Sequence, residues 1–92
     1  MILTLHIGHE SSHRYRARVF DGKDMVGDAT DHERIDDAIA YYGAEGEKRF
    51  PGVTEFSVWY GGWSIGQVSL DQMQADAPQL ANRLVVLSAV LR

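Results

Sequence analysis

The segment Val53–Leu70, VTEFSVWYGGWSIGQVSL, constrains the fold more than any other part of the chain. Two alternating runs flank Gly61-Gly62, and a two-residue type I′ turn needs positive φ at both central positions, which glycine adopts readily. The segment therefore predicts a β-hairpin. The predicted pairs on its first face are Tyr60–Trp63, Val58–Ile65, Phe56–Gln67 and Thr54–Ser69.

The two faces of this hairpin differ in character. The face with Tyr60 and Val58 is aromatic and β-branched near the turn, and we expect it to enter the core. Trp59 points to the opposite face, because side chains alternate along a strand. A bulge at Gly66 would change the register beyond that point.

A second period-two pattern covers residues 2–20 and predicts another hairpin. A two-residue turn at Ser11-Ser12 would place Ile7 opposite Arg16 on the same face, so an odd-length loop is favoured. With Glu10–Ser12 as the loop, the predicted pairs are His9–His13, Ile7–Tyr15, Leu5–Ala17 and Leu3–Val19. The opposite face then carries Thr4, His6, Arg14, Arg16 and Arg18.

Residues 21–50 predict a turn, a short strand and a helix. Residues 25–29 fit a third strand, and Thr30 with Glu33 fits a capping box. The helical stripe that follows is Ile35, Ala38, Ile39 and Tyr42. Gly43 or Gly46 is a potential end for this helix, but we favour a helix to Phe50 because Pro51 is the firm stop. Gly46 would then lie on the packing stripe.

The C-terminal segment predicts an unusually apolar helix. Residues 71–75 fit a loop or a helical turn, and Asp76 can cap a helix with Pro78 in its first turn. Residues 84–91 are apolar at every position except Ser88, and a helix that is apolar all round is usually covered on more than one side. A strand over 84–91 is a less favoured alternative. The expected dimer-interface residues are Val85, Val86, Ala89 and Val90.

The length of 92 residues predicts a single domain over residues 1–92. The element order ββ(β)αββα predicts an α+β fold with an antiparallel four- to five-stranded sheet and two helices on one face. The chain has no cysteine, which excludes disulfides and cysteine metal sites. It has no basic, apolar leader and no apolar run of membrane-spanning length, so we expect a cytoplasmic protein that does not bind membranes. The net charge of −4 hides an arginine-rich start and an acidic segment over residues 21–37.

The polar hairpin face is the candidate partner-binding surface. Its predicted members are Arg14, Arg16, Arg18, His6 and Trp59. Arginines beside an aromatic platform are typical of single-stranded nucleic-acid binders, which is one alternative function. We favour a solvated face whose arginines pair with acids of residues 21–37 or of the helix, since the chain is acidic overall.

Evidence for catalysis is weak. The chain has no GxSxG, HExxH or phosphate-binding glycine loop, so we expect no enzyme activity, no catalytic residues and no cofactor. His9, Glu10 and His13 carry ligand types that zinc accepts. We favour their interpretation as ordinary loop residues and expect no metal.

Two strands, a short third strand and a capped helix, with VGDATD leading into the helix, resemble the small HicB-type antitoxin module over about residues 2–42. That family's cysteine-containing turn and helix-turn-helix have no counterpart here. The resemblance implies an inhibitor or antitoxin-like protein from a mobile element as an alternative function. The leading hypothesis is a non-enzymatic protein-binding or regulatory module, homodimeric through the C-terminal helix.

Overall fold

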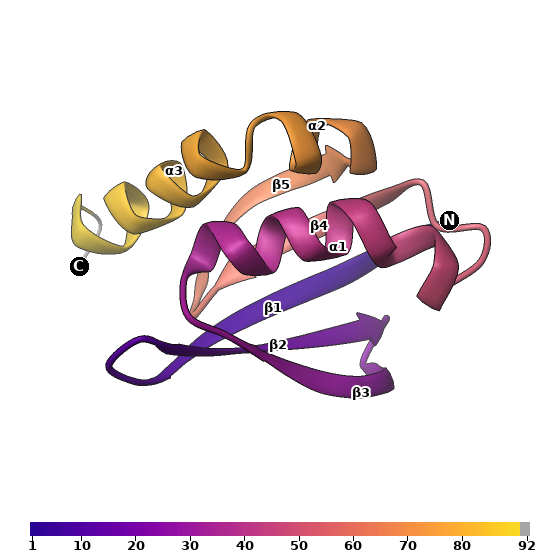
Figure 1. Cartoon of the computed structure of the whole chain (residues 1–92), viewed down its shortest axis with the longest axis horizontal. Coiled ribbons are helices and arrows are strands. Elements are labelled where there is room, and N and C mark those ends of the chain that lie inside the picture. The colour runs from indigo at the N-terminus through magenta and orange to yellow at the C-terminus, as the bar shows by residue number, and fades with distance from the viewer. Residues whose placement is uncertain (91–92) are drawn as a thin grey trace.

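The computed structural model describes residues 1–90, and for Val90 the backbone alone. A five-stranded sheet has the order β3-β2-β1-β4-β5, with the helices gathered on one side of it (Figure 1). In chain order the elements are β1 (Ile2–Ser11), β2 (Arg14–Asp21), β3 (Asp24–His32), α1 (Ile35–Arg49), β4 (Glu55–Tyr60), β5 (Trp63–Ser69), α2 (Leu70–Ala75) and α3 (Ala77–Val90). The predicted α+β class is confirmed.

The sheet is mixed, which corrects the predicted antiparallel sheet. β1 pairs in parallel with β4, whereas the other neighbouring strands pair antiparallel. The reason is the connection through α1. Because two successive hairpins leave β3 running in the same direction as β1, α1 carries the chain back across the sheet. β4 then begins at the end of the sheet where β1 begins, and it runs parallel to β1. The prediction of two helices is also corrected, because residues 70–75 form α2.

The first hairpin has the predicted faces but a different register. Leu5 lies opposite Val19, not Ala17, and the pairing shifts between His9 and Ser11. The turn is tighter than predicted, and His13 adopts a left-handed conformation with φ of 58°. Sliding by two residues keeps every side chain on its face, so the apolar alternation cannot distinguish the two registers.

The central hairpin turns at Gly61-Gly62 as predicted, but positive φ occurs at Gly61 and not at Gly62. Tyr60 pairs with Trp63, as predicted, and the register then shifts, so that Phe56 lies opposite Val68 instead of Gln67.

Ser64 and Gly66 hold a bulge in β5. The Ser64 hydroxyl donates to the Val58 carbonyl oxygen at 3.0 Å and accepts from the Gly66 amide at 2.9 Å. Gly66 has φ of 83°, a conformation that glycine adopts without steric cost. Ile65 becomes the extra residue of the bulge, and Val68 turns into the core.

The start of α1 differs from the predicted capping box. Thr30 belongs to β3, which runs on to His32, and the helix begins at Ile35 after Arg34, without a side-chain cap. The Thr30 hydroxyl instead bonds the hydroxyl of Tyr42 at 2.9 Å. The helix does continue to Arg49, as the favoured prediction had it.

The core lies between one sheet face and the helices. From the sheet it takes Leu3, Leu5, Ile7, Ala17, Val19, Phe56, Val58 and Val68, and from the helices Ile35, Ala38, Ile39, Tyr42, Met73, Ala77, Leu80, Ala81 and Leu84. Two glycines on the buried side of α1 allow close approach. A Cβ at Gly46 would lie 3.0 Å from the Phe56 ring, and one at Gly43 would lie 2.9 Å from the backbone nitrogen of Gln74 in α2.

These contacts predict that Gly43→Ala and Gly46→Ala destabilise the protein although alanine favours helix. Overpacking of this kind costs about 1–3 kcal/mol. Gly43→Ala should cost more, because its new methyl meets backbone, whereas at Gly46 it meets side chains. Urea unfolding measures both, with Ala44→Ser at an exposed position of α1 as the control. A Gly43→Ala variant as stable as the parent would contradict the packing described.

Candidate partner-binding surface

The sheet face opposite the helices, called the outer face below, brings the predicted partner-binding residues together. Arg18 lies opposite His6 across β2 and β1, and His6 lies opposite Trp59 across β1 and β4. The three side chains form one row across three adjacent strands. Arg14 and Arg16 continue along β2 on the same face, since side chains alternate along the strand.

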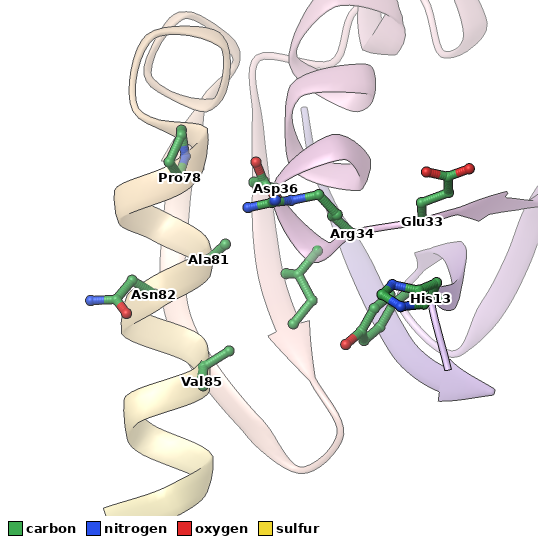
Figure 2. A pocket seen from close by; sticks show the side chains of 10 residues that line it. His13, Glu33, Arg34, Asp36, Pro78, Ala81, Asn82 and Val85 are labelled. Atoms are coloured by element: carbon green, nitrogen blue, oxygen red, sulfur yellow. The ribbon is translucent and has the colours of Figure 1, made fainter. Parts of the chain in front are cut away.

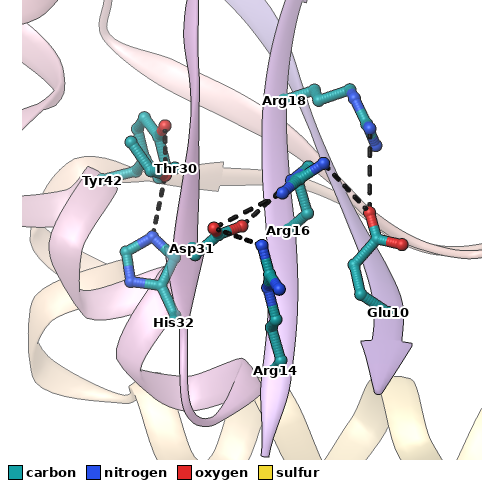
Figure 3. Close-up of polar contacts among 8 residues, drawn as sticks. All are labelled: Glu10, Arg14, Arg16, Arg18, Thr30, Asp31, His32 and Tyr42. Atoms are coloured by element: carbon teal, nitrogen blue, oxygen red, sulfur yellow. Dashed lines mark hydrogen bonds and ion pairs between the residues drawn. The ribbon is translucent and has the colours of Figure 1, made fainter.

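The three arginines share two carboxylates (Figure 3). Arg14 lies 3.2 Å from Asp31, and the Nε of Arg16 donates to Asp31 at 3.0 Å. Glu10 lies 3.7 Å from Arg16 and 3.8 Å from Arg18. Asp31 belongs to the acidic segment that was expected to pair with these arginines, whereas Glu10 comes from β1.

The electrostatics of this network are those of solvent-exposed ion pairs. The hydrogen bond from Arg16, followed by its charge and that of Arg14, lowers the pKa of Asp31, and partial desolvation opposes them. The hydrogen bond to Asp31 likewise raises the pKa of Arg16. Exposed pairs contribute little to stability because water and salt screen them. They orient the guanidinium groups and leave them partly exposed to solvent.

Trp59 and His6 are held in place by short polar contacts. The indole nitrogen of Trp59 donates to the Ser57 hydroxyl at 3.1 Å, and Nε2 of His6 lies 2.9 Å from the carbonyl oxygen of Gly61. The Trp59 side chain is nevertheless 36 % exposed. A large aromatic group with a fixed orientation therefore faces solvent on β4, beside the central strand β1 of the outer face.

Sequence reasoning missed three apolar members of the outer face. Phe20 is in phase with the arginines of β2, and it pairs with Met25 on β3. Ile2 is in phase with His6 on β1. Ile2 and Met25 are nearly half exposed. Strand alternation alone was sufficient to place Phe20 and Ile2 with the arginines.

The residues of the metal alternative are not assembled into a site. Glu10 contacts Arg16 and Arg18, and the ring of His9 packs on Tyr15 with centroids 5.2 Å apart. His13 lies at the turn. Within residues 1–90, no group of three or more potential ligands among His, Asp and Glu is close enough to hold a metal ion.

A polar contact beside the sheet edge has the distances of a nucleophile and a base. The Thr30 hydroxyl lies 2.8 Å from Nε2 of His32 and 2.9 Å from the hydroxyl of the buried Tyr42 (Figure 3). Burial lowers the pKa of His32, although the charges of Asp37 and Asp31 act in the opposite direction. Burial also raises the pKa of Tyr42. The arrangement ties β3 to α1, because Thr30 satisfies the only polar group of a core tyrosine.

The predicted dimer helix exposes part of its apolar surface. Val85 is 45 % and Val86 47 % exposed, and Ala89 is exposed too. The side chain of Val90 and all of Leu91 lie outside the described residues. Val85 lines a groove of about 420 Å³ between α3, the start of α1 and the turn after β1 (Figure 2).

Comparisons with known proteins give no relative: no family model, no curated protein and no solved structure matches the chain. The HicB-type resemblance gains no support from them. Among the described residues, no helix has the length and apolar character needed to cross a membrane.

The environment of His32 predicts a pH-dependent stability. Because burial lowers its pKa in the folded state, the unfolded chain binds more protons at this ring. The contribution of the neutral His32 ring to the free energy of unfolding is therefore fully present above the ordinary pKa of 6.5. This contribution is lost as the pH falls through that value towards the lower folded-state pKa. Urea unfolding at about pH 7.5 and about pH 5.5 should show a smaller loss for His32→Gln than for the parent.

The matched control is His13→Gln, which removes an exposed histidine from the turn. It should lose as much stability as the parent between the two pH values. Equal losses for the parent and His32→Gln would show that His32 does not contribute to the acid sensitivity.

Proposed function

We propose that the protein is a non-enzymatic binding module that recognises a protein partner with the outer face of its sheet. The observation that carries this proposal is the row of Arg18, His6 and Trp59 on a sheet face that no helix of residues 1–90 covers. Protein interfaces are enriched in aromatic residues, methionine and arginine, and their strongest contacts often centre on tryptophan and arginine. The outer face has this composition.

The arrangement also matches the physical demands on such a surface. Trp59 is fixed by Ser57, so little side-chain freedom remains to be lost on binding. The arginines already face carboxylates of their own chain, so a partner's acidic side chains would replace contacts of the same chemistry. Arg18 has the weakest such contact, at 3.8 Å, and lies in the row with Trp59.

Single-stranded nucleic acid is the second candidate, because bases can stack on Trp59 while phosphates contact Arg18. The net charge of −4 and the shared carboxylates favour a protein partner over a polyanion. Titration with single-stranded oligonucleotides at about 50 mM and about 200 mM salt distinguishes the two, since phosphate contacts give a steep salt dependence.

Trp59→Ala and Arg18→Glu should each weaken partner capture by at least about tenfold, as expected for contacts at the centre of an interface. The measurement is a pull-down from native lysate in which the protein bands held by each variant are quantified. Lys48→Glu reverses an 83 % exposed charge on α1 and should capture like the parent. If both outer-face variants also retain the parent's full set of bands, the outer face is not the binding surface.

A further inference from the structure

One side of α3 is apolar but is not packed against the rest of the described chain. Leu80 and Leu84 are buried against the rest of the molecule, while Val85 and Val86 are nearly half exposed. Residues 84–90 contain no charged side chain. The one polar residue among them, Ser88, donates its hydroxyl to the Val85 carbonyl oxygen at 2.8 Å. This hydroxyl is therefore engaged by its own helix.

The groove beside this helix joins apolar walls to a polar rim. Figure 2 shows Ala81 and Val85 on the side of α3 that faces the groove. Ile35 and Tyr15 contribute from α1 and β2. The remaining lining residues are His13, Glu33, Arg34, Asp36, Pro78 and Asn82. An apolar centre within a polar rim is the usual anatomy of a protein interface.

We propose that a second copy of the chain occupies this groove. In the resulting two-fold dimer, the exposed strip of each α3 (Val85, Val86 and Ala89) packs against the groove of the other copy. Val85 belongs to both surfaces, so the contact is self-complementary, as a two-fold interface requires. The outer face is a separate surface, so this dimer does not depend on the partner binding proposed above.

The charges around the groove suit a second copy although each chain carries −4. Arg83 is the single charged residue of α3 within 77–90, and the rim carries Glu33, Asp36 and Arg34. The rim of one copy together with the α3 of the other therefore brings two acids to two bases. Arg34 pairs with Asp36 at 2.8 Å, whereas Glu33 and Arg83 form no ion pair within residues 1–90. Two-fold symmetry can bring each unpaired arginine to the other copy's unpaired glutamate.

The surface area that a stable dimer must bury favours an interface made of α3 together with the groove over one made of α3 alone. A stable interface covers about 800 Å² on each partner. A 14-residue helix is only about 21 Å long and about 10 Å wide, so α3 by itself offers too little surface. Adding the groove walls and rim brings α1, β2 and the first turn into the contact. A small domain gains most from such burial, because it covers less of its own apolar surface.

Sedimentation velocity of the intact chain tests the dimer. The parent, 10.3 kDa per chain, should sediment with twice that mass at about 100 μM, a concentration at which moderate self-association is complete. Val85→Lys and Val86→Lys should sediment as monomers at the same concentration, with circular dichroism and unfolding temperature confirming that they fold. Met25→Lys is the matched control, because Met25 is 44 % exposed on β3 and should leave the dimer intact.

Charge exchange then tests where the second copy sits. Arg83→Glu and Glu33→Arg should each raise the dissociation constant roughly two- to fivefold, as for exposed ion pairs. The double variant should recover most of the parent affinity. A parent that stays monomeric at about 100 μM overturns the proposal. A dimer that persists in Val85→Lys also overturns it. If the two charge substitutions weaken the dimer additively in the double variant, the groove is not the binding site of the second copy.

Discussion

The structure depends on a single apolar layer between one face of the sheet and the helices that cover it, and α1 contacts the sheet directly within this layer. Gly46 permits this contact because a methyl group there would meet the Phe56 ring, and Gly43 does the same against the backbone of α2. Because α1 packs on the sheet, it carries the chain from β3 across β2 and β1, so that β4 reaches the free edge of β1. The parallel pairing of β4 with β1 follows from that crossing. The helices α1, α2 and α3 consequently lie on one side of the sheet (Figure 1).

One-sided coverage separates the molecule into two surfaces with different chemical character. The outer face presents fixed aromatic and cationic groups, and its ion pairs are exposed enough to be exchanged. The groove beside α3 joins apolar walls to a polar rim that includes Glu33, Arg34 and Asp36. A module that self-associates through its helices while keeping its sheet free presents two copies of the outer face at once. Such a pair binds a repeated or two-fold target more tightly than one copy does.

The sequence predicted the faces of the strands well because alternation specifies them directly, as Leu5, Ile7 and Val19 show. It did not predict register, because slipping by two residues preserves that alternation. The glycine at position 66 did indicate the bulge, but the hydrogen bonds of the Ser64 hydroxyl that hold it could not be predicted from the local pattern. The spacing of Thr30 and Glu33 fitted a helix cap. In the structure Thr30 instead pairs with β2, and its hydroxyl bonds the buried Tyr42 hydroxyl. The parallel pairing of β4 required knowledge of the α1 crossing.

The turn between β1 and β2 has a consequence for how this protein can vary in length. Its register was displaced by two residues from the pattern-based one, yet His6 and Arg18 kept their face. Adding or removing two residues at the turn would leave the outer face intact, whereas a change of one residue would exchange it with the core on the affected strand. Natural or engineered variants of this hairpin should therefore tolerate even-numbered insertions and reject odd ones, unless a compensating bulge absorbs the extra residue.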